Sequence, residues 1–315
     1  MVSIRPWIGS DLQAQTGSVN FDEECYREIR DACVLIRENP LPILTLCPGD
    51  VEMPACQRLM HDVRETLESG WGFCIIDRLP LDKMTENEAK TVYWLLSKML
   101  GRPVAQKWSD GRMLYSVTDL GKPSGDGVRP DVTNEDQSFH TDNSYNICPP
   151  DFVGLLCLKP AKEGGISRVV NMLAVVERMA KKHNGLLSRL YQPYFFDRQR
   201  EHAPDDRKTL FNPILCEEPD GLRVRVSRNL IYQGYSLESR LVDDEGEASL
   251  EAFFSIIDDP EMYKQFQFKE GQIQFLNNKL IGHKRTSFTD WLDKEKKRHL
   301  VRVWLREKGR QFYNG

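Results

Sequence analysis

The sequence predicts a mainly β fold with flanking helices, of the sandwich or jelly-roll kind. After residue 100, short apolar segments are separated by breaks rich in Gly, Pro and Asp, and each segment is expected to form a short strand. Helical stretches near residues 172–191 and 247–266 interrupt them, without the regular strand–helix alternation of a parallel sheet. The expected strands are 113–118, 152–158, 166–171, 209–216, 222–227, 272–276 and 299–306.

The first hundred residues are predicted to place helices around one strand. Helices are expected over 22–38 and 53–69. The first of them has one apolar face, made by Cys25, Ile29, Cys33 and Ile36. The run "WGFCIID" (71–77) has the apolar, β-favouring composition of a buried strand.

A third helix is expected over 86–100. Thr85 and Glu88 have the spacing of a capping box, in which each residue's side chain bonds the backbone N–H of the other. Gly101 supplies the stop, because glycine is favoured just after a helix.

The chain is expected to be a single domain over residues 1–315. It has no repeat and no clear linker, so a helical N-terminal part (1–70) is expected to pack on a core with helical insertions (71–306). The polar, Gly-rich segment 120–137 is long for a connection in a compact domain. Such a segment is often a lid or binding loop, and sometimes has no fixed structure.

Composition narrows the class of partner. The 315 residues are 40% apolar and 29% charged, with a net charge of −4, so nothing in the balance indicates nucleic acid or an anionic membrane. No run is long and apolar enough to span a bilayer, and the N-terminal residues lack the apolar core of a signal peptide. The 8 cysteines form no C-x-x-C pair, and several lie in apolar runs, which favours reduced thiols and a cytoplasmic location.

The stretch "SFHTDNSY" (138–145) places His140 and Asp142 two residues apart, just before the expected strand 152–158. In an extended chain such residues point to the same side, roughly 6.6 Å apart. An imidazole and a carboxylate suit Fe(II), Mn(II) or Zn(II). By itself this spacing is weak evidence, and a polar loop between two strands is the plainer explanation, so a metal site requires a third ligand elsewhere.

His283 is the best candidate for that ligand. It follows "GQIQFLNNKLIG", an alternating strand and a turn-like Asn277–Asn278 pair, so it is expected at a strand end after a hairpin. The remaining histidines have plainer explanations as surface, helix-end, loop or structural residues; they are His61, His183, His202 and His299. Two histidines and one carboxylate make the facial triad of non-haem Fe(II) oxygenases.

The C-terminal strand "RHLVRVWLR" offers a second test. By period two, one face carries Arg298, Leu300, Arg302, Trp304 and Arg306. A half-exposed strand with solvated arginines would explain this pattern. Alternatively, one inward arginine binds a carboxylate through a two-pronged contact.

Four motifs in this order resemble the Fe(II)- and 2-oxoglutarate-dependent oxygenases of the taurine dioxygenase-like (clavaminate synthase-like) superfamily, over roughly residues 70–306. They are "FHTD", "KPAKEGGIS", "NNKLIGHKRTSFTD" and "KKRHLVRVWLR". The resemblance implies a double-stranded β-helix (jelly roll) with flanking helices. It also implies that His140, Asp142 and His283 bind iron. Related halogenases replace the carboxylate ligand by a small residue; because Asp142 keeps it, halogenation is disfavoured.

The resemblance further implies a co-substrate site. Arg298 matches the arginine that grips the far carboxylate of 2-oxoglutarate, and Ser167 matches the residue that helps to hold it. The expected cofactors are Fe(II), 2-oxoglutarate and O2, and oxidative decarboxylation of 2-oxoglutarate would yield succinate and CO2.

The substrate is expected to be a small molecule, amino acid-like or anionic, and hydroxylation is the default outcome, with desaturation or cyclisation as variants. Arg302 resembles a position that contacts an anionic part of the substrate in some relatives, and further candidates follow the iron ligands: Asn143, Ser144, Tyr145 and Asn146. Arg223 and Arg225 also share a face, and Trp108 and Tyr115 are candidates for the cavity entrance. The plainer explanations are a structural role for Arg302, a solvated sheet edge for Arg223 and Arg225, and core packing for Trp108 and Tyr115. Homo-oligomers are compatible with the resemblance, since many relatives self-associate.

Two other classes stay open on the residues alone. A metal-dependent hydrolase or isomerase would use the same His/Asp/His set but would leave Arg298 and Ser167 without a role. A non-catalytic jelly-roll binding protein would keep the cavity without turnover.

Overall fold

The structure is a computed structural model that describes residues 4–121 and 132–315. Its largest element is a 7-stranded sheet with the order β1-β2-β13-β5-β16-β3, in which β4 also pairs with β16. Most neighbouring strands in it are antiparallel. The strands are β1 (Ser18–Asn20), β2 (Phe73–Asp77), β3 (Arg102–Val104), β4 (Tyr115–Val117), β5 (Phe152–Lys159), β13 (Ile273–Asn277) and β16 (His299–Arg306).

A second, 3-stranded sheet has the order β12-β7-β14, and the remaining described strands form 2-stranded ribbons. The second sheet consists of β12 (Tyr263–Phe266), β7 (Ser167–Asn171) and β14 (Ile281–Arg285). The ribbons are β8 (Pro193–Asp197) with β9 (Thr209–Pro213), β10 (Leu215–Glu218) with β11 (Gly221–Val224), and β6 (Glu163–Gly164) with β15 (Phe288–Thr289).

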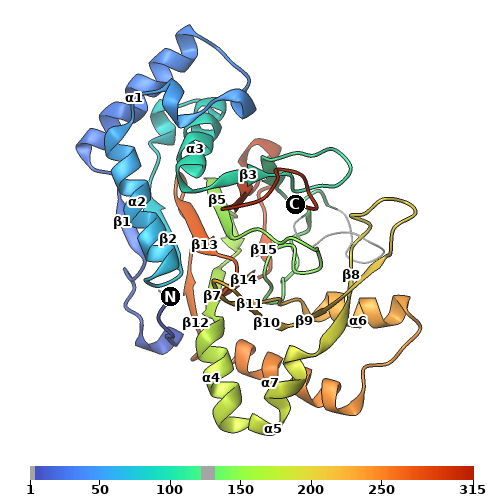
Figure 1. Ribbon diagram of the computed structural model, residues 1–315. Helices are drawn as coiled ribbons and strands as arrows, with labels where there is room; N and C mark the ends of the chain where they lie inside the picture. The colour runs from blue at the N-terminus through green and yellow to red at the C-terminus, as the bar shows by residue number, and fades with distance from the viewer. Residues whose placement is uncertain (1–3, 122–131) are drawn as a thin grey trace.

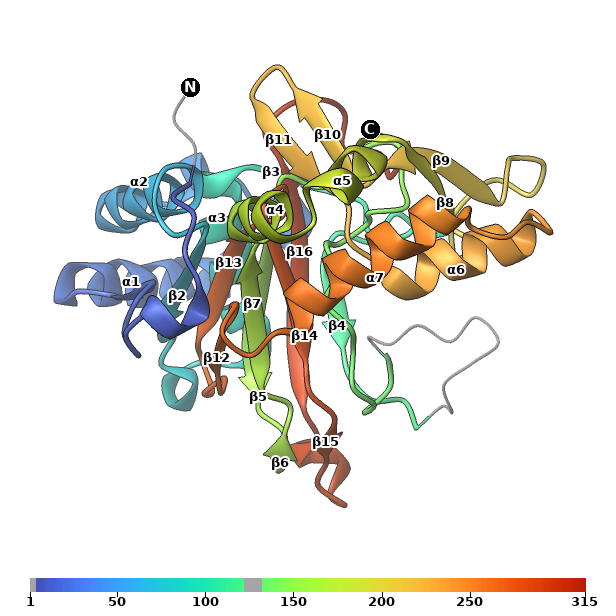
Figure 2. The same ribbon diagram turned by 90° about the horizontal axis from the view of Figure 1, so that it is seen from below.

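Helices lie on both sides of this β core (Figures 1 and 2). One group, next to β2, comprises α1 (Glu23–Glu38), α2 (Pro54–Glu68) and α3 (Glu86–Leu100). A second group comprises α4 (Met172–Lys182), α5 (Asn184–Leu187) and α7 (Asp244–Asp258), while α6 (Arg228–Leu237) packs on β8. The chain is therefore mainly β with flanking helices, as the sequence predicts.

The helix α3 shows why the local prediction succeeds. The Thr85 side chain accepts a hydrogen bond from the Glu88 N–H, and the Glu88 carboxylate accepts one from the Thr85 N–H, as in the expected capping box. The helix ends at Leu100, and Gly101 follows it. The apolar face of α1 is likewise buried.

Two predicted helices are too long. The stretch 172–191 is broken at His183 into α4, α5 and a 3-10 turn. The stretch 247–266 ends as a helix at Asp258, and its last residues form strand β12. Pro260 cannot continue a helix, and β12 gains hydrogen bonds by pairing with β7.

The predicted hairpin before His283 is wrong. β13 and β14 follow one another in the chain, but β13 lies in the large sheet and β14 in the 3-stranded sheet. The segment 209–216 similarly divides at Ile214 between two ribbons. In each case, consecutive strands pair with different partners and belong to different sheets.

The two faces of β16 differ in chemistry. Val301, Val303 and Leu305 pack into the apolar core shared with α1, α2 and α3. The other face is not solvated: Arg298 is 5% exposed, and Arg302 is 8% exposed. The explanation by solvated arginines is therefore wrong. Buried cations need hydrogen-bond acceptors or anions as partners inside the protein.

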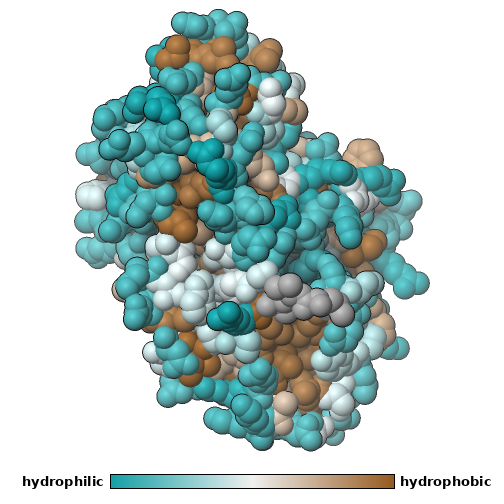
Figure 3. Space-filling view, turned by 60° about the vertical axis from the view of Figure 1, so that its left-hand side comes forward, coloured by the Kyte–Doolittle hydropathy of each residue, from teal (hydrophilic) through white to brown (hydrophobic). Residues whose placement is uncertain are grey.

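The molecular surface has no continuous apolar belt on the face drawn in Figure 3, where hydrophilic residues predominate and apolar ones gather in separate patches. Among the helices of residues 4–121 and 132–315, none combines the length and the apolar character needed to cross a bilayer.

Candidate metal centre

His140 and His283 are brought together by their backbones. Each N–H donates to the other residue's carbonyl, at 3.0 Å and 2.9 Å, in an antiparallel bridge. Residues directly opposite in such a bridge present their side chains on the same side. The ring centroids consequently lie 4.3 Å apart, although 143 positions separate the two residues in the chain (283 − 140).

Asp142 is held in place by Asn278. The Asn278 side-chain oxygen accepts from the Asp142 N–H at 2.8 Å, and its amide nitrogen donates to the carbonyls of Asp142 and Pro150. Asn278 is 2% exposed and belongs to the turn after β13. The turn-like Asn277–Asn278 pair therefore also fixes the position of a candidate ligand.

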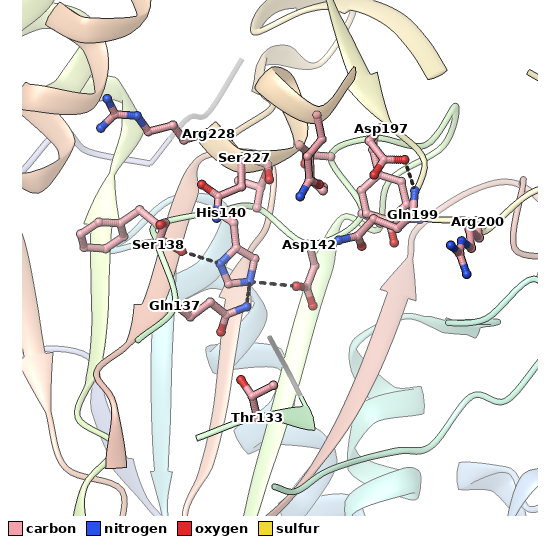
Figure 4. Close-up of a pocket in the computed structure, with 18 of the residues that line it drawn as sticks. Thr133, Gln137, Ser138, His140, Asp142, Asp197, Gln199, Arg200, Ser227 and Arg228 are labelled. Atoms are coloured by element: carbon pink, nitrogen blue, oxygen red, sulfur yellow. Dashed lines mark hydrogen bonds and ion pairs between the residues drawn. The ribbon is translucent and has the colours of Figure 1, made fainter. Parts of the chain in front are cut away.

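The three side chains converge on one point. Asp142 Oδ1 lies 3.3 Å from His140 Nε2 and 3.7 Å from His283 Nε2. The candidate ligand atoms of these residues all lie within 4.8 Å of one another. Figure 4 shows His140 and Asp142 facing each other, with the Gln137 amide nitrogen 3.3 Å from the same imidazole nitrogen.

The protonation states suit metal binding. His140 Nδ1 lies 3.0 Å from the Ser138 carbonyl, which only accepts hydrogen bonds, so Nδ1 donates there and Nε2 is the nitrogen that faces Asp142 and can bind a metal. Burial, and then the neighbouring His140, lower the pKa of His283 to about 3, so this imidazole is neutral at physiological pH. Burial acts to raise the pKa of Asp142, but the nearby Arg302 cation, the largest opposing cause, holds this pKa well below its ordinary value.

These residues fit a divalent metal. Two imidazoles and an ionised carboxylate can each offer one lone pair from one side, which leaves the opposite side for exogenous ligands. Borderline ions such as Fe(II), Mn(II) and Zn(II) accept this set of donors.

The second oxygen of Asp142 is turned away from the histidines. The Trp304 indole N–H donates to Oδ2 at 2.6 Å, and an Arg302 nitrogen lies 3.3 Å from the same oxygen. The Arg302 Nε donates in turn to Gln106 Oε1 at 2.8 Å. The carboxylate is thereby oriented with Oδ1 towards the imidazoles.

Replacing Trp304 by phenylalanine is expected to weaken metal binding by roughly 10- to 100-fold, the usual effect of removing a group that orients a ligand. Phenylalanine keeps most of the ring but loses the N–H that fixes Oδ2. Titration with Co(II), followed by calorimetry, measures this affinity. Trp94→Phe is the matched control, because its buried indole donates instead to the Leu46 carbonyl. An unchanged affinity in the Trp304 variant would show that the hydrogen bond does not orient the ligand.

A small cavity of about 50 Å³ adjoins His140 and His283 on one side. Ser167 from β7 and Arg298, just before β16, both line it. Burial lowers the pKa of the Arg298 guanidinium to about 10, so it remains a cation at neutral pH. Phe288 lies 5.1 Å from its guanidinium carbon, and no acidic side chain in the described part of the chain makes an ion pair with it.

A larger cavity of about 670 Å³ opens on the other side of His140 and Asp142. Asn143, Ser144 and Tyr145 line it, together with Arg302. Residues 122–131 of the expected lid lie outside the described residues, but Thr133 and Glu135–Gln137, near its end, also line this cavity.

Asn146 does not line either cavity. Its side chain accepts from the Ile147 N–H and donates to the Tyr313 carbonyl, so its polar atoms are engaged within the protein. The structure therefore places Asn146 behind the cavity lining, and its expected contact with substrate stays a prediction.

Arg225 is a positioning residue that sequence reasoning missed. It is 7% exposed, and one of its nitrogens donates to the carbonyls of Ser144 and Asn146, both at 2.7 Å. The neighbouring Arg223 is also buried and pairs with Asp151 and Glu218. The solvated-edge explanation of both arginines is wrong.

Comparison with known proteins identifies a family and a relative that match most of this chain. A model of the family described as "Taurine catabolism dioxygenase TauD, TfdA family" matches residues 46–304. FR-33289 synthase from Streptomyces rubellomurinus is 28% identical over 297 residues, covering 92% of this chain and 86% of that relative.

Two solved structures share the fold. Asparagine oxygenase, in complex with Fe(II), 2S,3S-3-hydroxyasparagine and succinate, has a TM-score of 0.67 at 16% identity, with 94% of each chain covered. The non-haem iron oxygenase OrfP, in complex with Fe, succinate and (3S)-hydroxy-L-Arg, has a TM-score of 0.67 at 14% identity, covering 92% of this chain and 94% of that chain.

Proposed function

Because this chain belongs to the taurine catabolism dioxygenase TauD, TfdA family, we propose that it oxidises a C–H bond of a small, amino acid-like or anionic metabolite. The enzyme is a non-haem Fe(II)- and 2-oxoglutarate-dependent dioxygenase, which converts 2-oxoglutarate to succinate and CO2 with O2. Hydroxylation is the outcome we propose, with desaturation or cyclisation as chemically related variants.

His140, Asp142 and His283 hold the ferrous ion in this proposal. The observation that carries it is the convergence of their ligand atoms within 4.8 Å beside a buried, cationic Arg298. Iron, when bound, couples O2 to the decarboxylation and to oxidation of the substrate. The protein's own groups orient the carboxylate through Trp304 and Arg302.

Arg298 and Ser167 hold the co-substrate. A dicarboxylate that enters the smaller cavity must bury its far carboxylate, and a buried anion requires a partner. Arg298 supplies a two-pronged, charge-assisted contact, while the Ser167 hydroxyl adds a hydrogen bond. Both residues are less than 9% exposed, so little water competes.

The larger cavity holds the substrate. Its lining carries acidic side chains, among them Glu135 and Asp197, and basic ones, among them Arg200 and Arg302. A molecule with both an ammonium and a carboxylate group finds partners of each sign there. Asn143 and Tyr145 contribute polar groups next to Asp142, and Arg302 contributes a cation between the two cavities.

The large sheet and the 3-stranded sheet enclose this site as the two halves of a double-stranded β-helix within one oxygenase domain. The site lies where β14 faces the large sheet, with His283 on β14 and Arg302 on β16. A reduced, cytoplasmic environment suits the free cysteines and the ferrous ion.

Succinate production tests this function. The protein is incubated with Fe(II), ascorbate, 2-oxoglutarate and a panel of amino acids and other small anionic metabolites, and substrate-dependent succinate is expected above a His140→Ala control. Turnover of a metabolite without O2 or 2-oxoglutarate would contradict the proposal. The proposal would also be contradicted if the iron-loaded protein formed no more succinate than the His140→Ala control, both with every metabolite of the panel and without any metabolite.

A further inference from the structure

Gln274 is an unusual residue for the middle of a buried strand. It lies in β13 between Ile273 and Phe275, both 0% exposed. Gln274 itself is 2% exposed, and its side-chain amide nitrogen is buried without a hydrogen-bond partner in the described part of the chain. Nearly all buried polar atoms are paired in folded proteins, so an orphaned donor here calls for an acceptor that arrives with a ligand.

The sheet register shows which way Gln274 points. It lies opposite Leu155 of β5, and Leu155 lies opposite Arg302 of β16. Cross-strand neighbours share a face, so these three side chains point to the same side of the large sheet. Ile273 and Phe275 point to the other side and join the apolar core with the helices.

That shared face forms the floor of the smaller cavity. Gln274, Leu155 and Arg302 all line it, together with His283 and Arg298. The row through Gln274 includes Arg302, which lies 3.3 Å from the Asp142 carboxylate, so this row marks the metal end of the cavity. Arg298 lies four positions earlier in the chain, towards the opposite end.

We propose that the Gln274 side-chain amide donates a hydrogen bond to the C1 carboxylate of 2-oxoglutarate, the carboxylate at the metal end, while Arg298 binds the far one. This inference rests on the proposed function, because it assigns a further recognition residue to the same co-substrate. A neutral amide suits this end of the cavity, since the ferrous ion and Arg302 already supply positive charge there. The Gln274 amide adds a directional hydrogen bond, which favours a planar carboxylate group at that end.

Gln274→Leu removes the hydrogen-bond donor and replaces it by an apolar side chain of similar size. A hydrogen bond to a charged group corresponds to roughly 10- to 100-fold in affinity, so the Kd for 2-oxoglutarate is expected to rise by about that factor. The Kd is measured anaerobically on the Fe(II)-loaded protein, from the visible charge-transfer band that the chelated co-substrate produces. The Fe(II) affinity without co-substrate is expected to stay within about threefold of the unmodified protein.

Two arms locate the contact. 2-Oxopentanoate keeps the C1 carboxylate but lacks the far one, so Gln274→Leu is expected to weaken its binding by the same factor as that of 2-oxoglutarate. If only 2-oxoglutarate is affected, the amide serves the far carboxylate and the assignment is overturned. Gln274→Glu is expected to weaken both ligands further, because it places an anion against an anion.

Gln272→Leu is the matched control. Gln272 lies just before β13, and by period two it is on the same face, but its amide already binds the Lys269 N–H and the Asp77 carboxylate, and it lines neither cavity. Its Kd for 2-oxoglutarate is expected to be unchanged. If the unmodified protein shows the band and Gln274→Leu binds 2-oxoglutarate within twofold of it, the inference fails although the proposed function stands. If the unmodified protein forms no band, the proposed function fails first, and this inference with it.

Discussion

Asp142→Ala is expected to abolish iron-dependent turnover and the charge-transfer band with 2-oxoglutarate. The variant removes the only anionic group among the three candidate ligands, and two neutral imidazoles then have to hold a dication next to Arg302. The remaining charges repel the ion, because Arg302 would lose the carboxylate that now lies 3.3 Å away. Anaerobic Fe(II) titration and succinate assays measure the two losses.

The same substitution is expected to lower the free energy of unfolding by about 3 kcal/mol. Removing one partner of a buried ion pair costs about 3–5 kcal/mol, and the lower end applies because Gln106 still accepts a hydrogen bond from Arg302. Urea unfolding of the metal-free protein gives this number. Asp142→Asn separates the two effects, since it keeps an acceptor for the Trp304 indole but carries no charge.

Asp243→Ala is the matched control for Asp142→Ala. Asp243 caps α7 and pairs with Arg189, so the variant also removes a carboxylate from an arginine, but outside both cavities. It is expected to bind iron as the unmodified protein does. An Asp142→Ala protein that is folded and keeps the band at full intensity would mean that this carboxylate is not an iron ligand.

The sequence predicts the local features of this protein well. The capping box at Thr85 and Glu88, the apolar face of α1 and the alternation along β16 all depend on neighbours within a few positions, and each is present. The spacing of His140 and Asp142 belongs to the same class, because residues two apart in an extended chain lie on one side.

The helix α6 and the strand β8 show where local patterns are insufficient. Gly234 lies inside α6, and glycine lowers helix propensity. A Cβ at that position would lie 2.5 Å from the Phe195 carbonyl oxygen, so the glycine allows the helix to approach β8 closely. The residue that weakens the local signal is thus needed for a contact that no local pattern contains.

The surroundings of Asp142 were not predictable for a similar reason. Asn278, Trp304 and Arg225 each act on the 142–146 segment from a distant part of the chain. Their sequence contexts are ordinary: a turn, an aromatic residue in a strand, and an arginine in an alternating segment. Long-range pairings bring them to the site: residue 140 pairs with both His283 and Ser227, and β16 pairs with β5.

Arg298→Gln is expected to raise the Kd for 2-oxoglutarate by roughly 100-fold or more. Truncating one partner of a buried, hydrogen-bonded charge pair costs about 2–5 kcal/mol, and each 1.4 kcal/mol is tenfold in affinity. The charge-transfer titration used for Gln274 measures the effect. Arg298→Lys keeps the charge but loses the planar guanidinium, so its Kd is expected to lie between those of the unmodified protein and Arg298→Gln.

Arg168→Gln is the matched control, because it removes one positive charge at the edge of the same cavity. Arg168 binds Gln265 and stacks on Tyr263, and it is not buried. Its variant is expected to bind 2-oxoglutarate within about threefold of the unmodified protein. Equal losses in the two variants would mean that the cavity attracts the co-substrate by its overall charge and that Arg298 makes no specific contact.

Arg298→Gln is expected to weaken co-substrate binding without lowering the stability of the ligand-free protein. Burial disfavours the charged form of Arg298 and lowers its pKa, so the cation destabilises the protein as long as no anion accompanies it. The ligand-free variant is therefore expected to unfold at the same temperature as the unmodified protein or higher. Stabilisation by added 2-oxoglutarate, by contrast, is expected to be largely lost, because a ligand stabilises only through its affinity for the folded state. A variant that is less stable without ligand would instead assign Arg298 to the structural core. The two melting curves thus decide whether this buried cation serves the fold or the co-substrate.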